Sequence, residues 1–297
     1  MEEEKIYDCI IVGAGPGGLQ AAIYLGRYNR NVLLIDRGGG RTLHAKQIEN
    51  FLSWNSISGK EIIDKGIDQA KAFGASIEAG RVTGIAKSGL FHISADKKLF
   101  LSEFVIVSSG VRDNIPNIRN LHKFFGKSFF TCVDCDGYNT TGKKLVIIGD
   151  SIETVRLAFA MKQMFTKDIT LILISYSPPA DFRGELSAEA IELIQGAPRE
   201  IIGTEKMEAI ELEDGRRFAC DVILSDFGFE LNDDFLAGLS LQRDSRSGHY
   251  VVSRNYESSL TGLYIIGPLN TGQDQAVIAA GEGAAAAIDI NKRLLKI

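Results

Sequence analysis

The chain has 297 residues, which is long for one compact core and suits two domains. Its formal net charge is -5, so it lacks the basic footprint of a nucleic-acid-binding protein. No apolar run reaches the roughly 18 residues that a membrane-spanning helix needs. The acidic start MEEEK also differs from the basic start of a secretory signal, and we expect a cytoplasmic protein.

The first third of the chain predicts a β-α-β unit. Residues 6–12 are apolar and rich in β-branched side chains, as in a buried strand. A glycine-rich loop, an amphipathic helix over residues 19–28 and a second buried strand ending at Asp36 follow. Such a unit implies a parallel sheet. A loop-rich stretch then leads to a predicted helix over residues 60–73 and to several strands within residues 76–107.

A second β-α-β pattern covers residues 144–175, after a proline-containing linker over residues 111–118. A strand-rich stretch over residues 201–228 follows, and the chain ends with the apolar strand GLYIIG and an Ala/Gly-rich helix over residues 274–295. This order predicts an α/β fold with two Rossmann-like domains. We expect one domain from residues 1–116 and 246–297, and an inserted domain from residues 117–245.

The loop after the first strand fits the dinucleotide-binding pattern G-x-G-x-x-G in its full strand–loop–helix context. Gly13 permits the tight turn, Gly15 lets a pyrophosphate approach the backbone, and Gly18 allows close helix–strand packing. The following helix N-terminus offers N–H groups to the phosphates, and Asp36 can accept hydrogen bonds from ribose hydroxyls. The pattern alone does not choose between FAD and NAD. The loop residues expected at the cofactor are Gly13, Gly15, Pro16, Gly17 and Gly18.

Four cysteines carry different expectations. Cys9 and Cys220 lie in apolar, strand-like runs and are interpreted as small buried side chains. Cys132 and Cys135 form a C-x-x-C pair, whose spacing allows a reducible disulfide. A zinc site needs four ligands, whereas this chain has no second C-x-x-C and its four histidines are scattered, so we expect no metal. A chemically passive pair remains an alternative.

Taken together, these segments resemble the low-molecular-weight thioredoxin reductase family over nearly the whole chain. Besides the glycine-rich start and the C-x-x-C-D-G segment, the resemblance is carried by Ile48–Phe51, Ser108–Gly110 and Gln275–Gly283. It implies an FAD cofactor, a homodimer and a thioredoxin-like protein or small disulfide as partner. The further cofactor-binding residues that it implies are Asn50, Gly110, Gly267, Gln275 and Ala276.

The resemblance also implies roles around the cysteines. Cys135 would be the thiol on the flavin side, Cys132 would react with the partner disulfide, and Asp136 would donate and accept the proton. Asp134 stands where the family commonly carries a neutral residue. A nearby carboxylate disfavours a thiolate, and we hypothesise that Asp134 lowers the reduction potential of the pair.

Two departures from the family concern cofactors. Pro268 follows Gly267 where the family has an aspartate that holds the ribityl chain, and Asn270 is a candidate substitute. In the inserted domain, Gly149 stands alone where the family has a glycine loop for NADPH, two residues look deleted, and Asp150 would repel a pyrophosphate. The next strand is followed by no arginine pair for a 2′-phosphate, since Arg183 stands alone.

We therefore do not expect NADPH to bind. The chain resembles the pyridine-nucleotide-independent branch of the family, in which ferredoxin or a second flavin supplies electrons. A second FAD in the inserted domain is therefore a further candidate cofactor. Three alternatives stay open: a dithiol oxidase that uses oxygen, an NADPH-dependent thioredoxin reductase, and a non-enzymatic flavin redox sensor. The basic residues considered as a patch for an acidic ferredoxin are Arg112, Lys123, Lys127, Lys143 and Lys144.

Overall fold

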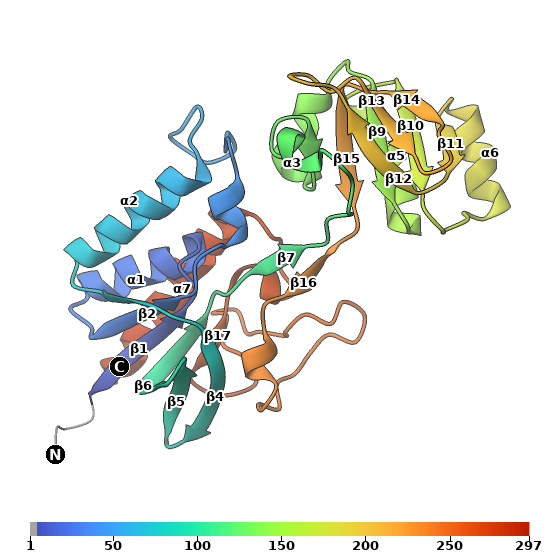
Figure 1. Cartoon of the computed structure of the whole chain (residues 1–297). Helices are drawn as coiled ribbons and strands as arrows, with labels where there is room; N and C mark the ends of the chain where they lie inside the picture. Colours follow the sequence, from blue (N-terminus) through green and yellow to red (C-terminus); the bar gives the residue numbers. More distant parts are fainter. Residues whose placement is uncertain (1–4, 297) are drawn as a thin grey trace. The chain divides into compact units, whose positions relative to one another are not determined.

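A computed structural model of the chain describes residues 5–296. It divides into two compact units, one of Met1–Arg112 with Glu230–Ile297 and the other of Asp113–Phe229 (Figure 1). Short strands β7 (Val111–Asp113) and β16 (Phe229–Leu231) pair with each other where the chain passes between the units. Both units are α/β, as the sequence predicts.

The first unit is built on a seven-stranded sheet in the order β3-β2-β1-β6-β5-β4, with β17 also paired to β6. Pairing is parallel from β3 to β6 and between β17 and β6, whereas β4, β5 and β6 are antiparallel. The strands are β1 (Ile6–Val12), β2 (Val32–Asp36), β3 (Ser76–Ala79), β4 (Val82–Ser88), β5 (Leu90–Ala95), β6 (Lys98–Val107) and β17 (Leu263–Ile265). The helical segments are α1 (Pro16–Arg27), η1 (Arg41–His44), α2 (Gly59–Ala72), η3 (Asp234–Leu236), η4 (Gly267–Leu269) and α7 (Ala276–Leu294).

The two faces of this sheet bury alternate residues of each strand, as strand geometry requires. Cys9 and Ile11 of β1 join a core cluster with residues of α1 and α7. Ile10 and Val12 join a second cluster on the opposite face, together with Tyr250 and other residues of the returning chain. Continuous apolar runs such as IYDCIIV therefore predict this strand correctly, because a parallel strand is covered on both faces.

Helices α1 and α7 cross at backbone contact distance. A Cβ atom placed on Gly283 of α7 would lie 2.1 Å from the carbonyl oxygen of Gly17 in α1. Only glycine permits this approach, and it places the first turns of α7 beside the glycine-rich loop.

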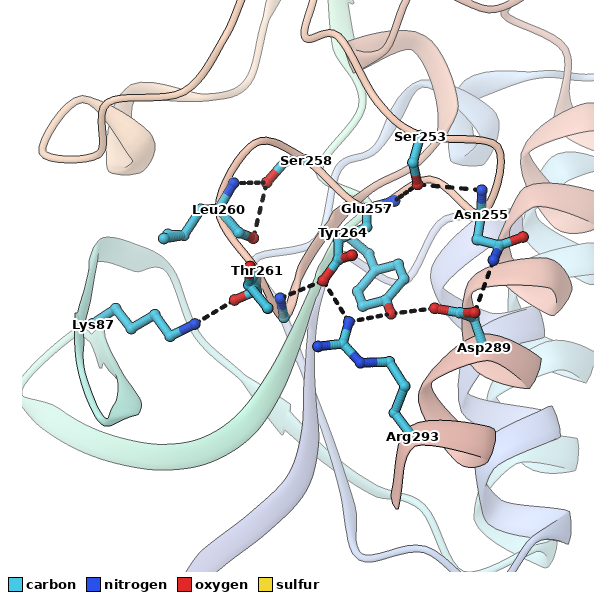
Figure 2. A network of polar contacts seen from close by, with 11 residues as sticks. Lys87, Ser253, Asn255, Glu257, Ser258, Leu260, Thr261, Tyr264, Asp289 and Arg293 are labelled. Atoms are coloured by element: carbon cyan, nitrogen blue, oxygen red, sulfur yellow. Dashed lines mark hydrogen bonds and ion pairs between the residues drawn. The ribbon is translucent and has the colours of Figure 1, made fainter. Parts of the chain in front are cut away.

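The far end of α7 is fixed by a polar network that Figure 2 shows. Tyr264 of β17 donates a hydrogen bond from its hydroxyl to Asp289 Oδ2 at 2.5 Å, and Arg293 donates to the Tyr264 hydroxyl at 3.0 Å. Arg293 also pairs with Glu257, while Asn255 donates to Asp289 at 2.8 Å. The loop before β17 and the end of α7 are thereby held together.

The second unit has a five-stranded parallel sheet in the order β11-β10-β9-β15-β8 and a three-stranded antiparallel sheet β12-β13-β14. The strands are β8 (Phe129–Phe130), β9 (Leu145–Gly149), β10 (Ile169–Leu173), β11 (Glu192–Gln195), β12 (Pro198–Ile202), β13 (Ala209–Leu212), β14 (Arg217–Ala219) and β15 (Val222–Asp226). The helical segments are α3 (Leu121–Phe124), α4 (Val133–Asp136), η2 (Gly137–Thr140), α5 (Ile152–Met164) and α6 (Ala180–Ala188).

The structure differs from the sequence prediction at several boundaries. Helix α1 begins at Pro16 rather than near residue 19, because proline is favoured in the first turn of a helix. Residues 230–245, expected in the inserted domain, belong to the first unit, since Leu236 packs into its core beside Tyr250. Helices α4 and α6 were not predicted.

Candidate functional site

The glycine-rich loop after β1 makes the turn that its sequence predicts. Gly13 has a φ of 104°, and a Cβ on it would lie 2.4 Å from the carbonyl oxygen of Ser108. Gly15 is the N-cap of α1 with Pro16 next to it, and α1 has neither a side-chain cap nor an acidic residue in its first turn. The N–H groups of that turn lack intrahelical partners, so this helix end suits an anionic phosphate.

Gly17 and Gly18 serve close packing. A Cβ on Gly18 would lie 2.0 Å from the carbonyl oxygen of Gly13, which matches the helix–strand packing that the motif predicts. A Cβ on Gly17 would lie 2.9 Å from the carbonyl oxygen of Ala279 in α7. These two glycines therefore hold the loop against its surroundings.

Asp36 at the end of β2 reaches back to the same loop. Its Oδ1 accepts a hydrogen bond from the Ala14 N–H at 2.9 Å, and its Oδ2 accepts one from the Gly38 N–H at 2.8 Å. A carboxylate has lone pairs for further donors such as ribose hydroxyls. A cavity of about 420 Å³ opens here, with the apolar side chains of Ile67 and Ile77 beside Asp36. The loop, the open helix end and this cavity fit the ADP part of a dinucleotide.

The segments expected at the flavin end come together at the start of α7. Asn50 donates a hydrogen bond to Gln275 at 3.2 Å, although the two residues are far apart in sequence. Arg41 forms an ion pair with Asp274 at 2.7 Å next to it. Gln275 is the N-cap of α7 and Ala276 its first residue, and the first turn contains no acidic side chain. The positive end of the helix dipole is therefore available for negative charge.

Gly110 and Gly267 both adopt positive φ, 66° and 72°, at the ends of neighbouring strands. A residue that the sequence did not single out, Asn232, holds the first of these segments: its N–H donates to the Gly110 carbonyl at 3.0 Å and its Nδ2 to the Ser109 carbonyl at 3.1 Å. Asn232 also accepts a hydrogen bond from Arg37 at 2.8 Å. No local pattern marks this residue, because its partners are distant in sequence.

Asn270 does not have the role considered for it as a ligand of the ribityl chain. It is 2% exposed, its Nδ2 donates to Glu282 at 2.9 Å, and its Oδ1 accepts from the Gly272 N–H at 2.6 Å. The side chain is committed to the protein interior, and Glu282 is a second buried polar residue that the sequence analysis missed.

In the second unit, Cys132 and Cys135 form a disulfide with a Cα–Cα distance of 5.3 Å. Cys132 follows β8 and is the N-cap of α4, so that its Sγ accepts a hydrogen bond from the Cys135 N–H at 3.1 Å. Cys135 and Asp134 are exposed, and Asp136, the predicted proton carrier, is half-buried at the end of α4. The remaining cysteines are buried free thiols, and burial raises the pKa of Cys220 to about 12.

The loop after β9, at the place of a second dinucleotide site, is short and closely packed around Gly149. Only two residues separate β9 from α5, whereas three separate β1 from α1. A Cβ on Gly149 would lie 2.2 Å from Thr154 Oγ1 and 2.7 Å from the carbonyl oxygen of Asp226. The loop follows β9, which is paired with β15 at the point where the strand order of the parallel sheet reverses and ligands usually bind.

Asp150 closes the same loop from the other side. Its Oδ1 accepts hydrogen bonds from the N–H groups of Ser175 at 2.6 Å and Tyr176 at 2.5 Å, and its Oδ2 accepts one from the Ser175 hydroxyl. Partial burial would raise the pKa of Asp150, but these hydrogen bonds outweigh it and hold that pKa below its usual range. Helix α5 is capped by Ser151, whose Oγ accepts from the Thr154 N–H.

The basic residues considered as a ferredoxin patch depart from expectation. Lys127 and Lys144 precede β8 and β9, and so lie toward the amino ends of these parallel strands, whereas the cysteines follow the carboxyl end of β8. These two lysines and the disulfide therefore belong to opposite edges of the sheet.

Two searches of the described residues concern metals and membranes. No group of three or more His, Cys, Asp or Glu side chains within residues 5–296 is arranged to hold a metal ion. Over the same residues, no helix has the length and apolar character to cross a membrane.

Comparison with known proteins places this geometry in a family. The model of the family described as "Pyridine nucleotide-disulphide oxidoreductase" matches residues 7–283, so the chain belongs to this family. A thioredoxin reductase of Bacillus subtilis (strain 168) is 32% identical over 58% of this chain, and the match spans about half of that relative, 55% of its length. The "34.2 kDa protein in rubredoxin operon" of Clostridium pasteurianum is 26% identical over 98% of both chains.

Among solved structures, the thioredoxin reductase from Streptococcus pyogenes MGAS5005 superposes with a TM-score of 0.90. It is 23% identical and covers 98% of this chain and 99% of that structure. It therefore shows that the fold, with both Rossmann-type units, is that of a thioredoxin reductase.

Proposed function

We propose that the protein is a flavin-dependent disulfide oxidoreductase of the thioredoxin reductase type. The observation that carries this proposal is the disulfide of Cys132 and Cys135 in a C-x-x-C-D-G segment, within a chain whose other unit has an open dinucleotide loop. FAD, held by the loop at Gly13 and Gly15 and by Asp36, would supply a two-electron reservoir.

The chain's own residues account for the disulfide chemistry. Reduction of the disulfide takes up two electrons and two protons and leaves two thiols. The thiolate of Cys132 attacks a disulfide of the partner, one partner sulfur leaves as a thiolate, and Cys135 then displaces the second. The products are the reformed Cys132–Cys135 disulfide and a reduced partner. Asp136 carries the protons that these steps release and consume. A thioredoxin-like protein or a small disulfide is the proposed partner.

We further propose that NADPH is not the electron donor. Three features support this: the loop after β9 is shorter than the loop after β1, Asp150 occupies the N–H groups after β10, and α5 is capped by Ser151. Each removes space or donors that a dinucleotide phosphate uses. The proposed donor is ferredoxin or a second FAD.

A second candidate is an NADPH-dependent thioredoxin reductase. It is favoured by the retained β9-α5-β10 arrangement in the second unit and by the family description, which names a pyridine nucleotide. We also propose, from the family resemblance, that the protein is cytoplasmic and forms a homodimer. Light scattering of the purified protein tests the homodimer.

The donor experiment compares NADPH, reduced ferredoxin and a free dithiol under anaerobic conditions, with the flavin absorbance as readout. We expect ferredoxin to reduce the flavin and support turnover of a disulfide such as thioredoxin, whereas NADPH does neither. Cys135→Ser is the matched control, which keeps the flavin but cannot pass electrons to a disulfide. Steady NADPH oxidation overturns the donor proposal. A separate aerobic assay, in which a dithiol drives oxygen consumption, would indicate an oxidase instead.

A further inference from the structure

A buried carboxylate lies directly behind the turn that follows β17. Glu282 of α7 is 3% exposed, and its Oε2 accepts hydrogen bonds from the Gly267 N–H at 2.5 Å and from Asn270 Nδ2 at 2.9 Å. Burial raises the pKa of Glu282, and these two hydrogen bonds oppose the shift in part. Burying a carboxylate costs free energy unless it accepts hydrogen bonds from buried donors. Glu282 accepts two such hydrogen bonds.

Asn270 extends this contact across the whole turn of residues 267–272. Its Oδ1 accepts from the Gly272 N–H at 2.6 Å, while its Nδ2 also contacts the Ile265 carbonyl at 3.4 Å. Pro268 has no N–H to donate, and the Asn270 N–H donates to the Gly267 carbonyl at 3.2 Å, so side-chain and backbone hydrogen bonds together set the shape of the turn. Glu282 and Asn270 therefore form one network that closes the turn from inside.

The turn and Glu282 both bear on the start of α7. The turn leads within a few residues to Gln275 and Ala276, and Glu282 lies on the helix that begins there. Its neighbour Gly283 packs against the backbone of Gly17. The network of Figure 2 holds the far end of α7. Glu282 holds the other end, the end near the flavin site, by its hydrogen bond from the Gly267 N–H.

We propose that Glu282 is a positioning residue of the flavin site, which holds the turn of residues 267–272 in the shape that FAD binding requires. It supplies from α7 an anchor for a turn in which Pro268 has no N–H to donate. This inference rests on the proposed function in one respect, that the first unit binds FAD.

A pair of glycine substitutions tests the network without removing the acid. A Cβ on Gly272 would lie 2.7 Å from Asn270 Oδ1 and 3.2 Å from Glu282 Oε1, whereas a Cβ on Gly281 would meet no atom within 4 Å. Gly272 also lies outside the positive-φ region, so alanine fits its backbone. We expect Gly272→Ala to raise the Kd for FAD at least tenfold and Gly281→Ala to leave it within twofold, measured by fluorescence titration of the apoprotein.

The acid itself is tested by Glu282→Ala and the conservative Glu282→Gln, which keeps an oxygen for both donors. We expect the alanine variant to raise the Kd for FAD at least tenfold and the glutamine variant to stay within threefold of wild type. Thermal melting of each apoprotein shows whether the variant folds. If Glu282→Ala does not fold, the Gly272→Ala variant still tests the inference.

Two results overturn the inference: unchanged FAD binding by Glu282→Ala and Gly272→Ala, or a glutamine variant as weak as the alanine variant. If wild-type protein takes up no FAD, the proposed function falls with the inference. If the wild-type protein binds FAD and the variants bind it equally well, only the inference about Glu282 is wrong.

Discussion

Replacing Asp150 tests whether its carboxylate holds the loop after β9 closed. Asp150→Ala removes three hydrogen bonds, two from the N–H groups of Ser175 and Tyr176 and one from the Ser175 hydroxyl. Hydrogen bonds to a charged group are worth roughly 1.5–3 kcal/mol each when buried. Asp150 is half-buried and water replaces part of the loss, so we expect a local destabilisation of roughly 1–3 kcal/mol for the set.

The assay is amide hydrogen exchange of the segment after β10, followed by mass spectrometry. A loss of roughly 1–3 kcal/mol corresponds to about 5- to 150-fold faster exchange at Ser175 and Tyr176. Asp150→Asn is the matched control, because its side-chain oxygen can still accept from both N–H groups, and we expect a smaller increase.

The pH dependence has a definite sign. The pKa of Asp150 in the folded protein lies below its ordinary value, so its stabilisation is present above that value, about 3.9, and is lost as pH falls through the folded-state pKa. The exchange difference between wild type and Asp150→Ala should therefore shrink in acid, after correction for intrinsic rates. Equal exchange at pH 7, or a difference that persists unchanged in acid, refutes the reasoning.

Three further predictions concern single positions. Gly13→Ala should abolish FAD binding, because its Cβ would lie 2.4 Å from a backbone carbonyl at positive φ, while Gly40→Ala, which has open space, should retain the flavin; flavin content after purification checks both. Gly149→Ala should lower the free energy of unfolding of the second unit by roughly 1–3 kcal/mol, because the added Cβ overpacks the loop. Adding Thr154→Ala should restore part of this free energy. A single variant as stable as wild type contradicts the close packing around Gly149. Asp134→Asn should raise the potential of the disulfide by roughly 10–20 mV in a redox titration, and an unchanged or lower value rejects the charge effect.

Sequence patterns captured the features that depend on local residues. Strands β1, β2, β9 and β10 are short apolar runs. A strand that is covered on both faces is apolar on both faces, so an apolar run is enough to predict it. The glycine-rich loop likewise predicts its own turn, since Gly13 adopts the positive φ that the motif requires.

The missed elements depend on weaker or more distant signals. Helix α6 follows Pro178 and Pro179 and buries only Leu186, so it lacks the apolar stripe by which a helix is recognised. Residues 230–245 were assigned to the wrong unit, because their place is set by contacts of Leu236 with residues far away in sequence. Composition does not reveal such contacts.

The sequence predicts the segments of the candidate site, and the structure shows which of their residues contact each other. The hydrogen bond between Asn50 and Gln275 joins two segments that the resemblance had named separately. Asn270, in contrast, was considered for the ribityl chain and is turned to Glu282 instead. The direction of a polar side chain follows from its buried partners, which a single sequence does not identify.

The central claim is that electrons pass between FAD and the sulfurs of Cys132 and Cys135. The most direct measurement is anaerobic reduction of the bound flavin by a dithiol, followed by absorbance in wild type and in Cys135→Ser. Wild-type flavin should bleach while the variant stays oxidised, because the dithiol reaches the flavin only through the cysteine pair. Equal bleaching in both proteins, or a wild-type flavin that no dithiol reduces, contradicts the claim.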